Sequence, residues 1–199
     1  MLIGSNNSLT YLTPCSALQR VFRWVNRCQE VTYEEQYTYW GIRYFDIRLF
    51  VNKYGQMVIK NGYTKYSLFS LYSVFDYFDK RGDVVVNVSL DVSINEYISS
   101  DYNQAEAKFK GLCRVMETIY HNIIFTGGTR KFDNKVLYSF GKRKNNYNDM
   151  KIVAPAKWSP VYRFISKWLP FLIGRLNKKY IEKFKDKHIF LVLNYINRR

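Results

Sequence analysis

The chain has 199 residues, of which 47% are hydrophobic and 18% aromatic, so it is long enough to bury a sizeable core and is not intrinsically disordered. Lys and Arg number 31 against 16 Asp and Glu, which gives a formal net charge of +15. This surplus favours anionic partners such as lipid headgroups, nucleic acid or other polyanions, although a solvated basic surface without a specific partner explains it equally well.

Strand-type and helix-type segments alternate along the chain, which predicts one α/β domain with mainly parallel strands. In the first half we expect strands over residues 1–5, 41–51 and 57–61, helices over 15–25 and 68–78, and a helix or loop over 33–39. In the second half we expect strands over 84–90, 135–140, 151–154 and 189–196, a helix over 103–120, a break at 126–129, and a helix over 160–184 interrupted at Pro170 and Gly174.

A charged pair lies within the apolar strand predicted over residues 41–51. Asp46 and Arg48 are two residues apart, so their side chains project from the same face of the strand. Charges on such a face are costly unless they are paired or perform a function. We expect Asp46 to hold Arg48, so that Arg48 presents a fixed guanidinium fork to an anion such as a phosphate.

Five segments resemble the X-domain of phosphatidylinositol-specific phospholipase C. They are Met-Leu-Ile-Gly-Ser-Asn-Asn-Ser at residues 1–8, Gly-Ile-Arg-Tyr-Phe-Asp-Ile-Arg at 41–48, Met-Val-Ile-Lys-Asn-Gly at 57–62, Val-Val-Val-Asn-Val-Ser-Leu-Asp-Val at 84–92, and Phe-Leu-Val-Leu-Asn-Tyr-Ile at 190–196. The resemblance implies one domain over residues 1–199, folded as a compact, irregular TIM-type (β/α) barrel, with a phosphodiesterase site at the carboxyl ends of the strands.

The chain departs from this family at the positions that move protons. The family's two catalytic histidines fall on Asn6 and Asn61, and the acid that orients one of them falls on Asn194. An asparagine amide forms hydrogen bonds but does not gain or lose a proton at accessible pH. The resemblance therefore implies a pseudoenzyme that binds an anionic phospholipid headgroup or phosphate diester through Arg48, anchored by Asp46.

Two other functions remain open at this point. The chain could be an active phosphoric diester hydrolase with altered acid and base residues, or a basic adaptor that binds a membrane or nucleic acid and whose pocket is empty. His121 and His188 are the only histidines, and we expect both at the face opposite the site. Alternation along the strand directs Lys60 away from Asn61.

The resemblance also bears on ligands around Arg48. The resemblance places Asp91 at a calcium-ligand position of the eukaryotic members and Asn7 directly after the first histidine position, and with Asp46 they offer the oxygen atoms that a calcium ion prefers. We expect Asn7, Arg48 and Asp91 to bind the substrate. Arg48 occupies the place of another calcium ligand and repels a cation. We therefore expect no metal and no cofactor, and a pairing of Arg48 with Asp46 or with Asp91.

A basic segment precedes the last strand. Residues 160–187 combine apolar positions at helical spacing with many Lys and Arg, which is typical of a helix that rests on an anionic membrane. An ordinary barrel helix that buries its apolar side explains the same pattern. Nucleic-acid binding has only the net charge and the basic triplet at 142–144 in its favour, because no recognised motif accompanies them.

The cysteines and the hydropathy bear on location. Cys15, Cys28 and Cys113 are odd in number and lack metal-ligand spacing, which predicts reduced thiols in a cytoplasmic setting. Residues 1–5 turn polar at once, so we expect no secretory signal, and no apolar run reaches the roughly 18 residues that span a bilayer. We expect a cytoplasmic protein that makes peripheral contact with a membrane.

Overall fold

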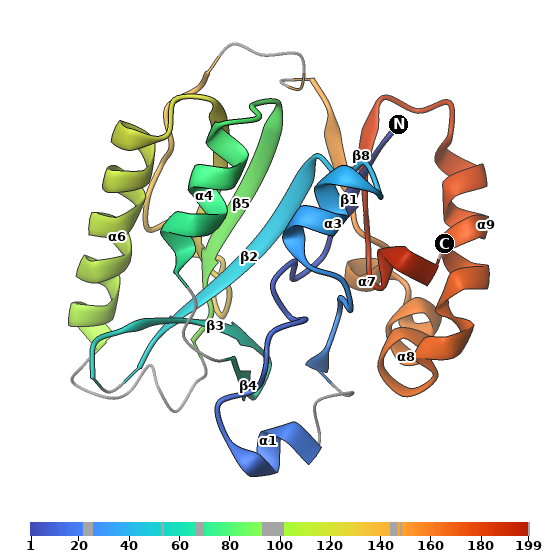
Figure 1. Ribbon diagram of the computed structural model, residues 1–199, viewed down its shortest axis with the longest axis horizontal. Helices are drawn as coiled ribbons and strands as arrows, with labels where there is room; N and C mark the ends of the chain where they lie inside the picture. The colour runs from blue at the N-terminus through green and yellow to red at the C-terminus, as the bar shows by residue number, and fades with distance from the viewer. Residues whose placement is uncertain are drawn as a thin grey trace.

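The computed structural model describes residues 1–21, 26–52, 54–66, 70–92, 102–143, 147 and 149–198. A curled sheet forms the centre of the molecule, with helices packed around it (Figure 1). Six strands run parallel in the spatial order β7–β8–β1–β2–β5–β6, with bounds Lys151–Val153, Ile189–Leu193, Leu2–Ser5, Tyr44–Val51, Val84–Leu90 and Ile123–Arg130. Among the described residues no pairing joins β6 to β7, so the barrel is incompletely closed. This confirms the expected irregular (β/α) barrel.

A hairpin departs from the parallel order. Strand β3 (Met57–Asn61) pairs antiparallel with the end of β2, and β4 (Thr64–Lys65) pairs antiparallel with β3. Gly62 turns the chain between them with a φ of +58°, a left-handed conformation that glycine adopts readily. The hairpin places Asn61 beside the carboxyl end of β1, at the end of the molecule where the site lies.

The helices lie between and beyond these strands. Their bounds are α1 Ala17–Val21, α3 Tyr33–Thr38, α4 Leu71–Asp79, α6 Tyr102–Ile119, α7 Pro155–Trp158, α8 Pro160–Trp168 and α9 Ile173–Phe184, with short 3-10 turns η1 Pro170–Leu172 and η2 Ile196–Arg198. No helix of the described residues is long and apolar enough to cross a membrane. The segment at 33–39 is a helix because Thr32 and Glu35 form a reciprocal capping box at its start.

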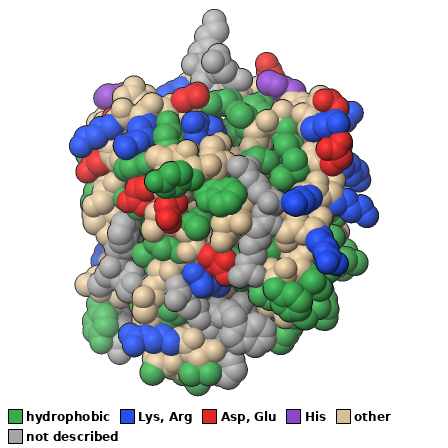
Figure 2. Space-filling view, turned by 45° about the vertical axis from the view of Figure 1, so that its right-hand side comes forward, with side chains coloured by type: hydrophobic (Ala, Val, Ile, Leu, Met, Phe, Trp, Pro, Cys, Tyr) green, Lys and Arg blue, Asp and Glu red, His purple; other side chains and the backbone are tan. Residues whose placement is uncertain are grey.

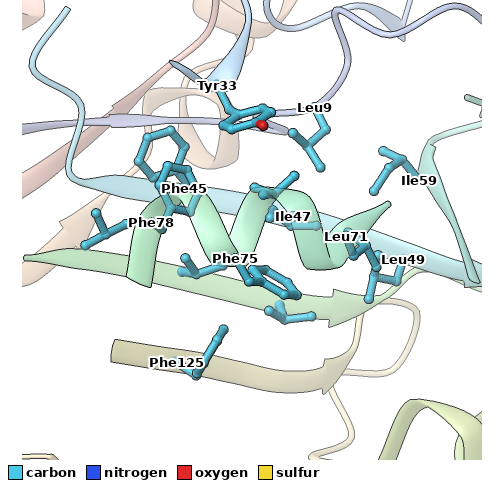
Figure 3. Close-up of a cluster of buried hydrophobic side chains, with 14 of the residues drawn as sticks. Leu9, Tyr33, Phe45, Ile47, Leu49, Ile59, Leu71, Phe75, Phe78 and Phe125 are labelled. Atoms are coloured by element: carbon cyan, nitrogen blue, oxygen red, sulfur yellow. The ribbon is translucent and has the colours of Figure 1, made fainter. Parts of the chain in front are cut away.

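The main core lies between α4 and the sheet. Leu71, Phe75 and Phe78 recur at helical spacing on the buried face of α4, and Figure 3 shows them against the side chains of β2. The rings of Phe45 and Phe78 lie 4.3 Å apart between centroids. Full burial of each such side chain stabilises the fold by about 1.5–3 kcal/mol, so this core fixes the position of β2 and of the charges that it carries.

The structure corrects three sequence-based expectations. Residues 135–140 form no strand of their own; they lie beside β6, and Thr129 pairs with Val136 in a single bridge. Residues 126–129 do not break the chain, because all four lie within β6. The long helix near the carboxyl end is interrupted at Leu169 and Pro170, whereas Gly174 lies within α9. Residues 22–25, in the helix expected over 15–25, lie outside the described residues.

A bulge in β6 explains the error at 126–129. The register between β5 and β6 shifts at Val88, where Gly127 and Gly128 have φ values of +93° and +69°. A Cβ atom on Gly127 would lie 2.4 Å from the carbonyl oxygen of Val88, so only glycine fits. The glycine pair therefore marks a bulge within a strand rather than its end.

Gly127→Ala should lower the free energy of unfolding by about 1–3 kcal/mol, because it forces alanine into a left-handed conformation and its Cβ against the carbonyl oxygen of Val88. Urea denaturation measures the change. Gly111→Ala is the matched control, since a Cβ there meets nothing within 4 Å and α6 should gain roughly 0.5–1 kcal/mol. If the two variants unfold at the same urea concentration, the bulge does not constrain the fold.

Candidate functional site

Three amide side chains meet at the carboxyl ends of the strands. Ser5 and Leu193 are in register at the ends of β1 and β8, so Asn6 and Asn194 follow their strands side by side. Asn6 Nδ2 donates a hydrogen bond of 2.6 Å to Asn194 Oδ1. Asn61 arrives from the end of β3, and all three side chains are buried. The structure thus brings together the three positions that the sequence placed in one site.

Arg48 lies among these amides and is held by its neighbour on β2. Its Nε donates to Asp46 Oδ2 at 3.2 Å, and the side chains are only 14% and 11% exposed. Its two terminal nitrogens donate to Asn61 Oδ1 and Asn6 Oδ1, each at 3.3 Å. Of the two expected pairings, Arg48 therefore makes the one with Asp46.

Asp46 is itself fixed by further donors. Asn87 Nδ2 donates to Asp46 Oδ1 at 2.8 Å from the neighbouring strand β5, and the backbone N–H of Asn7 approaches Asp46 Oδ2 at 3.4 Å. A buried carboxylate needs such partners, because an unpaired one would be strongly destabilising. The position of the guanidinium is therefore set by β1, β2 and β5 together.

A thiol that the sequence did not indicate lies at the centre of the amides. Cys28 Sγ accepts hydrogen bonds of 3.3 Å from Asn7 Nδ2 and from Asn61 Nδ2. Thr10 Oγ1 fixes this loop by accepting the backbone N–H of Cys28 at 2.9 Å. Burial raises the pKa of the Cys28 thiol, so the group is neutral at physiological pH. Cys28 comes from a loop rather than a strand end, so no periodic pattern pointed to it.

Asp91 pairs with a lysine instead of with Arg48. Lys131 directly follows β6, and its Nζ lies 3.3 Å from Asp91 Oδ2. The side chain of Lys131 is 39% exposed. Partial loss of water around the Lys131 ammonium, followed by repulsion from the Arg48 guanidinium, lowers the pKa of this group from its usual 10.5. Sequence reasoning missed Lys131 because it did not recognise β6; a strand ending at Arg130 would have placed Lys131 at the mouth of the barrel.

A cavity of about 260 Å³ opens beside Arg48. We call it the Arg48 pocket. Its described lining combines amides, one thiol and cations, and it contains no carboxylate: Asn6, Asn7, Asn26, Arg27, Cys28, Arg48, Asn61, Ala156, Lys157, Arg163, Ser166, Lys167 and Asn194. The amides suit hydroxyl groups and the cations suit an anion. The lining therefore favours a polar, negatively charged ligand.

The two histidines lie far from this pocket. His121 precedes β6 and His188 precedes β8, so both lie at the amino ends of parallel strands, opposite Asn194. The histidine side chains lie along the upper edge in Figure 2, whereas α8 lies in the lower half of the molecule in Figure 1. Lys60 is buried with its ammonium 4.5 Å from the centre of the Phe50 ring.

The oxygen atoms considered for calcium already have partners. Asp46 accepts from Arg48 and Asn87, and Asp91 accepts from Lys131. Over the described ranges no group of three or more His, Cys, Asp or Glu is placed to hold a metal ion. The site as built does not fit calcium, and the absence of a cofactor stays a prediction.

The basic triplet at 142–144 has a structural role in part. Arg143 donates to the carbonyl oxygens of Glu117 at 2.9 Å and Tyr120 at 3.0 Å, at the carboxyl end of α6. A cation at this end of a helix satisfies free carbonyl groups. Lys142 is exposed, and Lys144 lies outside the described residues. The triplet thus offers little support for a nucleic-acid site.

Comparison with known proteins identifies the fold that carries this site. No protein-family model and no curated protein sequence matches the chain. The chain is similar to a phosphatidylinositol-specific phospholipase C from Listeria monocytogenes, with a TM-score of 0.59, 11% identity, and coverage of 100% of this chain and 92% of the other. It is also similar to a mutant of the Staphylococcus aureus enzyme, with a TM-score of 0.54, 12% identity, and coverage of 98% and 85%. The fold is therefore that of the bacterial phosphatidylinositol-specific phospholipases C.

Proposed function

We propose that this chain binds the phosphate of an anionic phospholipid headgroup, or a related phosphate diester, through Arg48, and that it is impaired as a phosphodiesterase. The observation that carries the proposal is the anchored guanidinium of Arg48 in a pocket whose described lining has no carboxylate. The similar bacterial structures bear the name of enzymes specific for phosphatidylinositol, which supports this class of ligand.

The guanidinium of Arg48 can exchange two of its hydrogen-bond acceptors for phosphate oxygens. An arginine has five N–H donors, and here one holds Asp46 while two reach amide oxygens at 3.3 Å. The bonds to the neutral amides are long, and a charged phosphate oxygen is the stronger acceptor. A phosphate would therefore displace the amide oxygens of Asn6 and Asn61 while the ion pair with Asp46 keeps the fork in place.

The same amides explain why we propose impaired catalysis. Cleavage of a phosphodiester needs one group to take a proton from the attacking hydroxyl and another to supply one to the leaving oxygen. Asn6 and Asn194 bond to each other as neutral amides and do neither. Cys28 has a raised pKa, which removes it as a base near neutral pH.

An exposed apolar surface beside the pocket supports contact with a membrane. On the face shown in Figure 2, hydrophobic and basic side chains gather toward the lower right, the side of α8 and α9. The exposed apolar residues of this region are Trp158, Val161, Phe164, Trp168 and Phe171. Helix α8 packs on the core through Tyr162 instead, so the barrel-helix interpretation leaves this stripe without a role. A lipid surface would cover it and bring a headgroup to the Arg48 pocket.

Hydrolysis by altered residues is the second candidate, and Lys131 is the observation that favours it. Among the described residues, Lys131 is the lysine whose pKa is lowered, and the nearby Arg48 is one cause of this shift. A lysine with a lowered pKa can act as a general base when neutral. Asp91 holds it in place at the end of β6.

Arg48→Lys should weaken binding to phosphatidylinositol vesicles by roughly tenfold or more, because lysine keeps the charge but loses the fork that bonds two phosphate oxygens. Vesicle co-sedimentation against phosphatidylcholine measures the loss. Arg175→Lys, on the exposed side of α9, is the matched control and should bind like the wild type. Equal binding by the wild type, Arg48→Lys and Arg175→Lys would show that Arg48 does not bind the phosphate.

Histidines at the two positions where the family has them should raise the rate of hydrolysis. Asn6→His combined with Asn61→His should raise the turnover of phosphatidylinositol by about 10²–10⁴-fold over the wild type, the usual contribution of general acid and base groups. Release of the soluble inositol phosphate measures turnover. A wild-type chain that already hydrolyses the lipid rapidly would contradict the proposed impairment.

Any hydrolysis that the wild type does show should depend on Lys131. The neutral amine is the base, so the rate should rise with pH through a midpoint below the usual 10.5. Lys131→Gln should remove this rise, whereas the exposed Lys135→Gln should retain it. The measurement is the initial rate as a function of pH, and an unchanged profile in Lys131→Gln would assign the activity to another group.

A further inference from the structure

The cations of the Arg48 pocket divide into two groups. Arg48 lies at the floor, and Asp46 neutralises its charge at 3.2 Å. The remaining four cations belong to the loop before α3 and to the α7–α8 segment: Arg27, Lys157, Arg163 and Lys167. We call these four the rim cations. Within the described part of the chain, no carboxylate lies within 4.0 Å of a rim cation, so their charges are uncompensated.

The backbone fixes two of the rim cations. Arg27 donates through Nε and Nη2 to the carbonyl oxygens of Gln29 and Glu30, at 2.9 and 3.3 Å. Arg163 donates through the same two nitrogens to the carbonyl oxygens of Ala156 and Lys157, at 3.3 and 3.2 Å. In the described part of the structure Nη1 of each has no bonded partner. Two oriented guanidinium groups from different elements thus line one cavity.

Helix α8 separates a polar stripe from an apolar one. Arg163, Ser166 and Lys167 lie within one turn of the helix and line the pocket. Val161, Phe164 and Trp168 recur at the next helical positions and are exposed. The polar stripe therefore belongs to the pocket and not to the apolar face that we assigned to the membrane.

A ligand with a single phosphate group would contact Arg48 but leave the rim cations without an anionic partner. One phosphate on Arg48 matches the amide floor, but the four uncompensated rim cations would still face solvent. We propose that the rim cations form a second anion subsite, so that the pocket selects a polyol carrying two or more phosphate groups over a polyol carrying only one. This inference rests on the function proposed above, because the first phosphate lies on Arg48.

The ligand is defined by its chemistry and has two possible sources. A phosphorylated inositol can reach the pocket as a free molecule or as the headgroup of a lipid. The rim cations act in either case, because they contact the second phosphate and not the acyl chains. Since the lysines among them are exposed, the selectivity should fall as the salt concentration rises.

Isothermal titration of the full chain with inositol monophosphate, bisphosphate and trisphosphate tests the subsite. We expect the trisphosphate to bind roughly tenfold tighter than the monophosphate, as charge-assisted hydrogen bonds to a second phosphate would give. Lys157→Gln with Lys167→Gln removes two of the four rim cations and should reduce the preference for the trisphosphate. Both side chains are exposed, so the fold should tolerate the change. Lys178→Gln with Lys179→Gln removes the same charge from α9 and should keep the preference.

Different results overturn different claims. Equal affinity for the monophosphate and the trisphosphate, or a preference that is unchanged in the Lys157 and Lys167 variant, would overturn the second subsite while the function of Arg48 stands. No binding of any inositol phosphate or of phosphatidylinositol vesicles would overturn both. Vesicles that carry bisphosphorylated phosphatidylinositol, compared with phosphatidylserine vesicles of equal charge, then separate the sources. Preferential binding to the former assigns a lipid ligand and binding of the soluble probes alone assigns a free one; both support the subsite.

Discussion

The ion pair between Asp46 and Arg48 is the interaction on which the site depends. Both groups lie on β2, which packs against the aromatic core under α4, so the pair cannot move without disturbing the centre of the sheet. Taking two charges out of water is costly, and the cost is offset here by hydrogen bonds from Asn87 and from the backbone of Asn7. The result is a guanidinium whose direction is set before any ligand arrives, which lowers the entropic cost of binding.

Neutral amides surround this charge and give the site its character. Asn6 bonds to Asn194, and a tyrosine–amide chain supports Asn194 from behind, because Tyr162 Oη accepts its backbone N–H and donates to Asn177 Oδ1. Each link exchanges hydrogen bonds but no protons at neutral pH. Such a network is suited to holding a ligand, which is why we propose a protein that has kept binding and lost proton transfer.

The sequence was sufficient to predict the site residues whose positions are set by parallel strands. Asn6 and Asn194 follow strands that pair in register, so their proximity could be expected once both strands were recognised. It was insufficient where a residue reaches the site from a loop or from an unrecognised strand. Cys28 lies in a loop held by Thr10, and Lys131 follows a strand whose glycine bulge resembles a chain break. The rim cations on α8 were predicted as part of a basic helix, but only the tertiary structure separates their face from the apolar one.

Phosphorus NMR of phosphatidylinositol in mixed micelles tests the central claim most directly, because one sample reports both binding and cleavage. We expect the phosphodiester resonance to broaden or shift when the wild-type chain is added, and Arg48→Lys to reduce this effect at the same protein concentration. We also expect no resonance of a cleaved inositol phosphate to grow with time. A spectrum that does not respond to the protein, or a product resonance that grows at an enzymatic rate, would contradict a binding protein impaired in catalysis.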